Sequence, residues 1–395
     1  MAVAQKMLSF MENSSWIRKM FEEGARLKQI HGADKVFDFS LGNPNVPPPD
    51  MVHIKLRELV AGLTPGMHGY MPNAGLPETR AAVAAQLSKE KGLALSADQV
   101  IMTCGAAGGL NIILKSLLDP GDEVLTPVPC FVEYGFYADN HGGMLKTAPT
   151  HDDFTLDLNA LDQHLGPRTK VVLINSPNNP TGQIYSAASL AELAELLQRR
   201  SHQFGHPIYL VSDEPYCKIV YDGYEVPSIF ALYENSVIAT SYSKDLSLPG
   251  ERLGFVVVHP QAADLQPLVG ALTLANRILG FVNAPALQQR LIAGLQGLCV
   301  DVSIYKRKRD LLVASLRSAG YDLINPPGAF YLFPESPIAD DVRFVGLLQE
   351  ENILVVPGSG FFGPGHFRIA YCVDDRTIDG AIPGFHKALE RAKNL

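Results

Sequence analysis

The sequence has little of what marks a secreted, metal-binding or membrane protein. It contains five cysteines, an odd number without any Cys-x-x-Cys spacing, so neither a disulfide framework nor a zinc site is indicated. These cysteines are expected to be reduced thiols of a cytoplasmic chain. The residues after Met1 lack the apolar core and cleavage site of a signal peptide. The most apolar long window, 268–287, is interrupted by Asn276 and Arg277, which makes it too polar to span a membrane.

Positive charge is also scarce. The chain has 33 lysines and arginines against 41 aspartates and glutamates, which gives a formal net charge of −8. This balance argues against binding to nucleic acid or to an anionic membrane surface. The hydrophobic content of 47% is that of an ordinary globular protein. Since one domain usually takes roughly 100–200 residues, a chain of 395 residues is expected to form two domains.

From about residue 99 onward, short apolar runs rich in β-branched residues alternate with helical patterns, of which 187–203 is the clearest. This alternation predicts an α/β fold with a mostly parallel seven-stranded sheet covered by helices. In such sheets the ligand lies beyond the carboxyl ends of the strands. The seven runs are 100–103, 123–126, 144–147, 171–174, 208–212, 237–241 and 253–258.

The two ends of the chain predict a smaller α+β domain. Residues 1–40 are helix-prone, and the proline-rich segment 39–49 is expected to cross between domains. After Pro260 a long helical region is expected to run to about Gly297, followed by a helix at 305–318, a strand at 328–333 and a final helix at 380–393. We therefore expect an N-terminal arm that also forms part of the small domain (1–45), a large domain (46–284) and a small C-terminal domain (285–395).

Lys244 is the centre of the most informative segment, 241–254, which follows an apolar run. A lysine becomes a covalent catalyst when it forms a Schiff base with a carbonyl compound in a desolvated pocket. Ser241 and Arg252 would supply a hydroxyl and a planar set of donors for a phosphate. Pyridoxal phosphate is a carbonyl compound that carries its own phosphate. For a lone Ser-x-Ser-Lys string, a solvated lysine on a turn would be the better interpretation.

Other strand ends carry residues that suit the same ligand. Gly105, Ala106 and Ala107 open a helix, where small residues let backbone N–H groups approach an anion or simply let the helix pack closely. Phe131 is either a ring that stacks on a flat heterocycle or a core residue. Asn179, in the string Asn-Asn-Pro-Thr-Gly, could donate to a phenolic oxygen or belong to a plain turn.

Charged residues at two further strands extend this set. Asp213, after the run 208–212, could keep a pyridine nitrogen protonated, or it could cap a helix. Tyr216 could donate its hydroxyl to the ring oxygen. Arg368 lies in an apolar strand, where its guanidinium needs either a substrate carboxylate or a structural ion pair.

In this order and spacing, the motifs resemble the fold-type-I class I and II aminotransferases over nearly the whole chain. The resemblance implies that Lys244 forms a Schiff base with pyridoxal phosphate and that Asp213 pairs with the ring nitrogen. It implies that Asn179 and Tyr216 bind the ring oxygen, and that Phe131 and Pro215 cover the two ring faces. The phosphate would be held by Gly105, Ala106, Ala107, Ser241 and Arg252, and the substrate α-carboxylate by Arg368 with Gly42 and Asn179.

Residues 70–80 resemble a family string whose tyrosine reaches the phosphate in the partner subunit. Tyr70 therefore implies a homodimer with shared sites. The chain departs from the family pattern at Phe131, where tyrosine or tryptophan is usual, and at Ala106 and Ala107, which lack the hydroxyl of some members.

The activity implied is a ping-pong transfer of an amino group from an α-amino acid to a 2-oxo acid. A β-lyase or decarboxylase on the same scaffold is the alternative, and consumption of a keto acid would discriminate them. The sensing domain of a transcription regulator is a more remote alternative, because residues 1–40 offer no basic DNA-binding segment.

The donor is expected to be neutral or apolar, because a second carboxylate needs a second cation and Ala107 stands where one branch of the family has a lysine. Another branch brings an arginine from the partner subunit. Arg277 lies near that position, and is interpreted as either that arginine or a surface residue.

Overall fold

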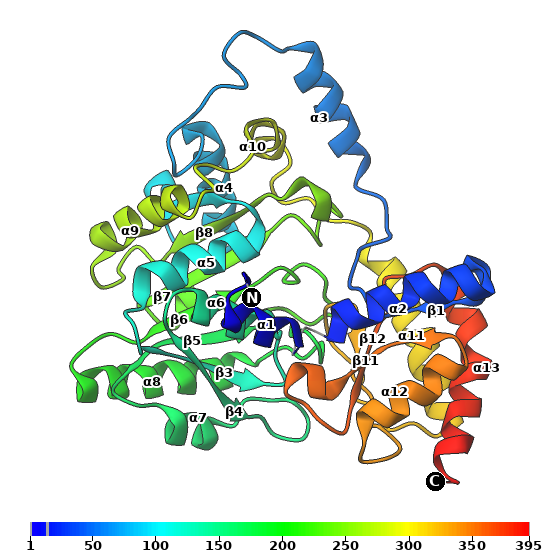
Figure 1. Cartoon of the computed structure of the whole chain (residues 1–395). Helices are drawn as coiled ribbons and strands as arrows, with labels where there is room; N and C mark the ends of the chain where they lie inside the picture. Colours follow the sequence, from blue (N-terminus) through cyan, green and yellow to red (C-terminus); the bar gives the residue numbers. More distant parts are fainter. Residues whose placement is uncertain (1, 13–15, 395) are drawn as a thin grey trace.

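A computed structural model of the chain describes residues 2–12 and 16–394 (Figure 1). Its centre is a seven-stranded sheet with the strand order β2-β8-β7-β6-β5-β3-β4. β8 runs antiparallel to both of its neighbours, and the other adjacent pairs are parallel. The prediction of a mostly parallel seven-stranded sheet is thus confirmed. The strands are β2 (Val100–Thr103), β3 (Glu123–Val128), β4 (Met144–Pro149), β5 (Thr169–Asn175), β6 (Tyr209–Asp213), β7 (Ser236–Ser241) and β8 (Gly254–Val258).

Alternate residues of these strands pack against two different sets of helices. In β7, Ile238 faces the layer formed by α4, α7, α8 and α10, while Val237 and Ala239 face the layer formed by α5, α6 and α9. Both faces are therefore covered by helices, which is why the strands read as continuous apolar runs. Figure 1 shows the sheet between α5 and α8. The helices are α4 (Pro77–Lys91), α5 (Gly105–Leu117), α6 (Glu133–Asn140), α7 (Leu158–His164), α8 (Ala187–Phe204), α9 (Leu265–Ile278) and α10 (Ala286–Ala293).

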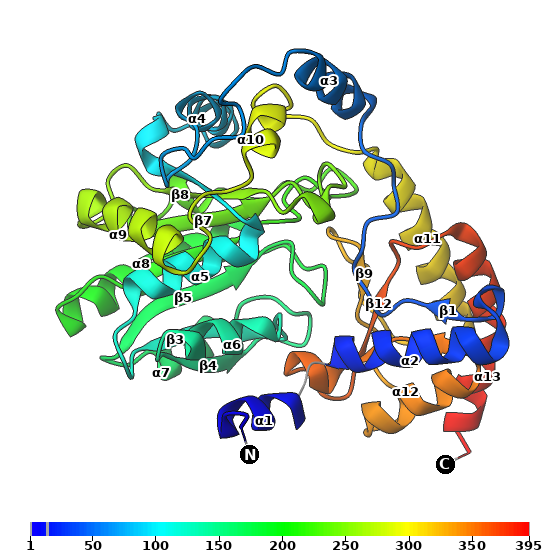
Figure 2. The ribbon, with the colours of Figure 1, turned by 45° about the horizontal axis from the view of Figure 1, so that its top comes forward.

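A second, smaller α+β part combines both ends of the chain (Figure 2, right). β1 (Phe37–Asp38) pairs in parallel with β10 (Ile353–Leu354), and β12 (Phe367–Ala370) lies between β11 (Val356–Pro357) and β9 (Tyr331–Leu332). Its apolar core contains Met20 and Phe39 from the N-terminal side together with Phe344 and Phe385. The helices around this core are α2 (Trp16–His31), α11 (Val302–Ala319), α12 (Asp341–Glu350) and α13 (Asp375–Ala392).

The small part made from both termini is thus as predicted. The boundaries 1–45, 46–284 and 285–395 stay a prediction. Residues 1, 13–15 and 395 of these segments lie outside the described part of the chain.

Two local predictions were wrong. The helical region expected from Pro260 to about Gly297 is broken into α9 and α10, because Gly280 adopts a φ of 90° and Pro285 precedes the second helix. The final helix begins at Asp375 rather than at Gly380. A Cβ on Gly380 would lie 2.3 Å from the ring of Phe37, so this glycine permits close packing and does not mark a helix start.

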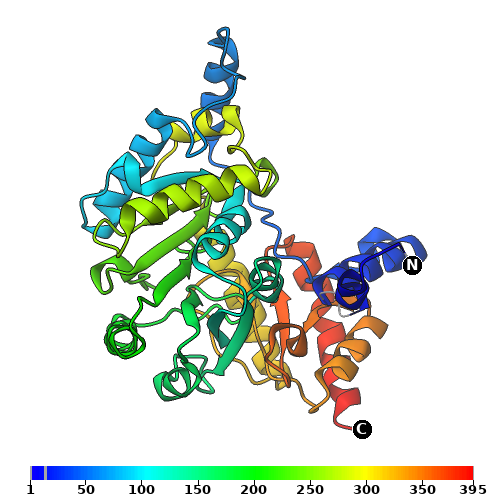
Figure 3. The ribbon, with the colours of Figure 1, turned by 60° about the vertical axis from the view of Figure 1, so that its left-hand side comes forward.

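Two helices lie at the outside of these layers, and α3 (Asp50–Ala61) joins the core through its buried residue Val52. α3 follows the proline-rich segment and stands out from the molecule (Figure 3), with Met51, Ile54 and Val60 exposed. α1 (Gln5–Glu12) contacts α6 through Phe10 and Phe136, whose ring centroids are 4.9 Å apart. Among the helices of residues 2–12 and 16–394, none combines the length and apolarity needed to cross a membrane.

Candidate active site

A cavity of about 320 Å³ lies beyond the carboxyl ends of β5, β6 and β7. This is where a parallel sheet is expected to bind its ligand. The cavity is closed by the start of α5, the start of α6 and residues of the small part of the molecule. It is lined by most of the predicted site residues: Gly42, Ala106, Ala107, Phe131, Asn179, Asp213, Pro215, Tyr216, Ser241, Lys244, Arg252 and Arg368.

Lys244 follows β7 and presents its amine to the cavity. Its Nζ donates a hydrogen bond to the backbone oxygen of Gly42 at 2.7 Å and lies 5.5 Å from the ring centroid of Phe330. No carboxylate of the described residues forms an ion pair with it. Burial therefore lowers the pKa of Lys244 to about 8. A larger fraction of the amine is then neutral near pH 7–8, which is the form that attacks a carbonyl.

Asp213, the last residue of β6, is a half-satisfied carboxylate. Its side chain is only 6% exposed. Oδ2 accepts a hydrogen bond from the hydroxyl of Tyr134 at 2.7 Å, but Oδ1 has no partner. Burial raises the pKa of Asp213 to about 7, although the Tyr134 hydrogen bond acts in the other direction. A cationic N–H donor in the cavity would complete this carboxylate.

Arg368 on β12 is a buried cation that lacks an anion. Its two terminal nitrogens donate to Asn179 Oδ1 at 2.9 Å and to the backbone oxygen of Ser40 at 2.5 Å, while Nε has no partner. No carboxylate of the described residues forms an ion pair with Arg368, so the alternative of a structural ion pair has no partner to support it. Burial accordingly lowers the pKa of Arg368 from its ordinary value. A carboxylate entering the cavity would satisfy both its charge and its free donor.

Tyr216 and Asn179 line the cavity where it meets the smaller α+β part of the molecule. The Tyr216 hydroxyl lies 2.7 Å from the hydroxyl of Tyr331, which the sequence did not single out. Gly42 faces the same tyrosine, and a Cβ there would lie 2.1 Å from the Tyr331 hydroxyl. Only glycine allows the chain to pass this close to the ring, which supports the choice of Gly42 as a site residue.

The opposite end of the cavity is suited to an anion. Ala106 and Ala107 belong to the first turn of α5, whose free backbone N–H groups carry partial positive charge. Ser241 and Ser243 add hydroxyls, and Arg252 adds a guanidinium. Gly105 does not line the cavity, but its φ of 72° and its closeness to Arg252, 3.0 Å from a Cβ placed there, leave no room for a side chain.

Comparison with known proteins agrees with this arrangement. The chain matches the family "Aminotransferase class I and II" over residues 34–384. It is 31% identical over 382 residues to a probable aspartate/prephenate aminotransferase of Aquifex aeolicus, covering 93% of this chain and 94% of that one. It is 29% identical over 394 residues to aromatic-amino-acid aminotransferase 2 of Thermococcus litoralis, covering 97% of both. A crystal structure of an amino transferase from Eubacterium rectale matches with a TM-score of 0.96 and 40% identity, covering 99% of both chains.

The chain belongs to the class I and II aminotransferases. It is a transaminase, as the sequence predicted, and this family implies pyridoxal phosphate as the cofactor.

Besides Gly105, two residues considered in the sequence analysis do not line the cavity of this aminotransferase. Tyr70 is 93% exposed, so within one chain it contacts no part of the site. Arg277 is an exposed residue of α9. Their predicted roles both involve a partner subunit and stay predictions.

The structure also adds residues that sequence reasoning missed. Tyr134, Tyr331, Glu133, Tyr137 and Ser243 line the cavity or bind its residues. Tyr134 and Glu133 directly follow the predicted Phe131 turn, so the start of that helix could have drawn attention to them. Tyr331 had no local signal, because it is 115 residues from its partner Tyr216.

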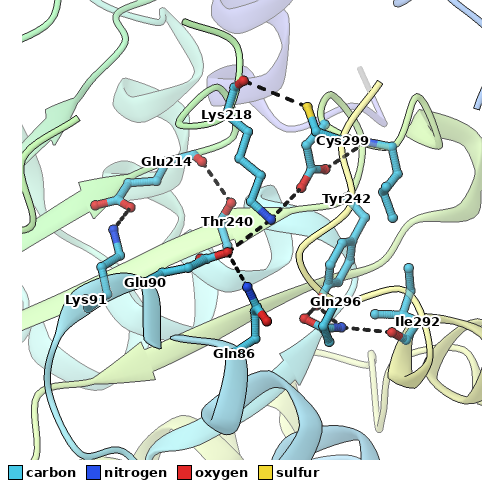
Figure 4. A network of polar contacts seen from close by, with 12 residues as sticks. Gln86, Glu90, Lys91, Glu214, Lys218, Thr240, Tyr242, Ile292, Gln296 and Cys299 are labelled. Carbon is cyan, nitrogen blue, oxygen red and sulfur yellow. Dashed lines mark hydrogen bonds and ion pairs between the residues drawn. The ribbon is translucent and has the colours of Figure 1, made fainter. Parts of the chain in front are cut away.

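Behind the cavity, the aminotransferase has a network of polar contacts (Figure 4). Glu214 forms an ion pair with Lys91 at 2.9 Å. Lys218 lies 3.4 Å from Glu90 and 4.0 Å from Asp245. Glu214 and Asp245 directly follow Asp213 and Lys244 in the chain, so this network holds the backbone of both site residues from the far side.

Proposed function

We propose that this aminotransferase binds pyridoxal phosphate in the cavity and transfers an amino group from an α-amino acid to a 2-oxo acid in a ping-pong cycle. The observation that carries the proposal is the pairing of two incomplete groups. Lys244 is an amine with a lowered pKa and no anionic partner, and Asp213 is a buried carboxylate with one unpaired oxygen. A carbonyl compound with a protonated ring nitrogen would complete both groups.

The residues present fit this cofactor. Arg252, Ser241 and the first turn of α5, residues 105–107, would hold its phosphate. Asn179 and Tyr216 would bind the ring oxygen, and Phe131 and Pro215 would cover the ring faces. When bound, the cofactor supplies an aldehyde and a ring that accepts electrons.

Three residues of the chain would act in the amino transfer itself. Lys244 would hold the cofactor covalently until substrate replaces it, and then carry the proton away from the substrate Cα as a general base. Asp213 would keep the ring nitrogen protonated. Arg368 would bind the α-carboxylate with its guanidinium, which Asn179 and the Ser40 backbone hold in place, and Gly42 would help to bind the substrate.

The preferred donor is proposed to be neutral or apolar. Three cationic side chains of the described residues line the cavity, namely Lys244, Arg252 and Arg368. The cofactor aldehyde would occupy the first, the cofactor phosphate the second and the substrate α-carboxylate the third. A side-chain carboxylate would enter without a cation of its own from this chain, at a high desolvation cost. The names of the relatives cover both aspartate/prephenate and aromatic substrates, so they do not decide this preference.

We further propose a homodimer in which Tyr70 reaches the cofactor phosphate of the partner subunit. Support comes from its 93% exposure in a single chain and from the family string around it. An aromatic ring this exposed suits a residue that another chain covers.

Lys244→Ala should abolish transamination, because no other lysine of the described residues lines the cavity to release product. The loss should be at least about 10⁴-fold in kcat/KM, as when a covalent catalyst is removed. Borohydride should fix the cofactor to the wild-type peptide that contains Lys244, as peptide mass spectrometry would show. Fixation on another lysine, with Lys244→Ala still active, would contradict the proposal.

A further inference from the structure

Glu133 is a charged group of the cavity that the proposed function leaves without a task. It is the first residue of α6, and it lines the same cavity as Lys244 and Arg368. The other acidic residue there, Asp213, is assigned to the ring nitrogen. Glu133 is not among the residues assigned to the cofactor or to the α-carboxylate, so the side chain of the donor is the remaining group that it would meet in this cavity.

The carboxylate of Glu133 has no partner within the described part of the chain. Neither a hydrogen bond nor an ion pair reaches it, in contrast to Glu214, which is completed by Lys91. With no donor or cation to offset it, burial raises the pKa of the Glu133 carboxyl. Tyr137, one turn further along α6, also lines the cavity. Burial raises the pKa of Tyr137, and the negative charge of Glu133 adds to this effect.

The charge of this residue discriminates between substrates. A donor with a side-chain carboxylate would bring a second negative charge toward Glu133 in a partly desolvated cavity, where like charges repel strongly. A donor with an ammonium or guanidinium group would instead complete the unpaired carboxylate. A donor with a neutral side chain would be neither strongly attracted nor strongly repelled by Glu133.

We propose that Glu133 is the specificity-determining residue of this aminotransferase, favouring donors with a cationic side chain and disfavouring dicarboxylic donors. The proposal rests on the proposed function, since it assumes an α-amino acid held by Arg368. It keeps the proposed disadvantage of acidic donors and assigns it to one residue, and it adds that a cationic side chain is favoured over a neutral one.

The test is the first half-reaction, in which an amino acid alone converts the bound cofactor and changes its absorbance. Four donors of similar size form two pairs that differ in side-chain charge: lysine against norleucine, and glutamate against glutamine. The apparent second-order rate constant is measured for each donor in wild type, Glu133→Gln and Glu133→Ser. Ratios within a pair cancel any loss of cofactor or of folded enzyme. Asp139→Asn, on α6 but outside the cavity lining, is the matched control.

Glu133→Gln should lower the lysine/norleucine ratio and raise the glutamate/glutamine ratio, each by about tenfold, as expected for loss of one charge at short range. Glu133→Ser should shift both ratios in the same directions, and Asp139→Asn should leave them within about twofold of wild type. Unchanged ratios in both Glu133 variants would overturn the inference, including the case in which a cation of the partner subunit neutralises Glu133.

Failure of the proposed function would look different. In that case no amino acid, alanine included, would change the cofactor absorbance or yield a 2-oxo acid. If all four donors react but their ratios ignore Glu133, the transaminase assignment stands and the role of Glu133 is wrong.

Discussion

Asp213 and Glu214 are neighbours in the chain, and both carboxylates are nearly inaccessible to water, yet their surroundings are opposite. Glu214 faces away from the cavity and is completed by Lys91 at 2.9 Å, with side-chain exposures of 3% and 10%. Asp213 faces the cavity, has no cationic partner and leaves Oδ1 unpaired. A buried carboxylate is thus paired on one side of the strand end and only partly paired on the other.

Lys91, which pairs with Glu214, and Lys244, which lines the cavity with Asp213, differ in the same way. Burial opposes the charge of Lys91, but the facing Glu214 carboxylate, together with Cys217 and Glu90, outweighs it and raises the pKa of Lys91 to about 12. Lys244, also largely desolvated but without an anion, has its pKa lowered to about 8. Buried charged groups that only support the fold are paired within the chain, whereas those at the cavity lack a partner, which a ligand would supply.

The largest effect is expected when the unpaired carboxylate at the cavity is removed, and it is an effect on the rate of the reaction. Asp213→Asn should slow removal of the substrate α-proton by roughly 10²–10⁴-fold, since the ring nitrogen would lose the carboxylate that keeps it protonated. Cofactor binding should be partly retained because the phosphate contacts lie elsewhere. Single-turnover rates with α-deuterated and ordinary alanine would measure the step. Near-normal turnover would mean that Asp213 only supports the fold.

The contrast also predicts opposite effects on the stability of the cofactor-free protein. The folded pKa of Asp213, about 7, lies above its unfolded value, so the stability linked to its proton is present at low pH and is lost as the pH rises through 7. Asp213→Asn should therefore stabilise the protein at pH 8, by at most about 4 kcal/mol, and change it little near pH 4. Glu214→Gln should destabilise it by about 3–5 kcal/mol at pH 8, because Lys91 would remain buried without its anion.

Urea denaturation at both pH values would measure these changes. The double variant Lys91→Met/Glu214→Gln is the control, and it should recover much of the loss because no unpaired charge remains. If Asp213→Asn and Glu214→Gln shift stability in the same direction at pH 8, the contrast between the two carboxylates is wrong.

A smaller effect, on the affinity for the cofactor, is expected from the contact that Tyr70 would make in the partner subunit. Tyr70→Phe should weaken cofactor binding by about tenfold, as when one hydrogen bond to a charged group is lost. Heterodimers that combine a Lys244→Ala subunit with a Tyr70→Phe/Arg252→Ala subunit should regain one intact site. Verified heterodimers without recovered activity would place each site within a single chain.

The seven strands could be predicted within two residues of their observed ends, because a sheet buried on both faces requires uninterrupted apolar runs. The polar residues at the strand ends could be found for the same reason, since they stand out against those runs. Tyr331 could not, because nothing in its local sequence indicates which surface it will face. Glu133 could be suspected only from its place just after the predicted Phe131 turn. The start of α13 was misplaced because Gly380 serves a contact with Phe37, which is distant in sequence.

The pairing of β1 with β10 has a consequence for synthesis of the protein. Phe37 meets Ile353, so its partner is translated long after it. At roughly 5–20 residues per second, the delay is roughly 15–60 s. All seven strands of the large sheet are made within that interval and can assemble, while α2 and β1 still lack most of the residues that bury them. A nascent chain therefore carries its N-terminal apolar residues uncovered until almost the end of translation, which makes this segment the place where chaperones should bind and where premature termination should lead to aggregation.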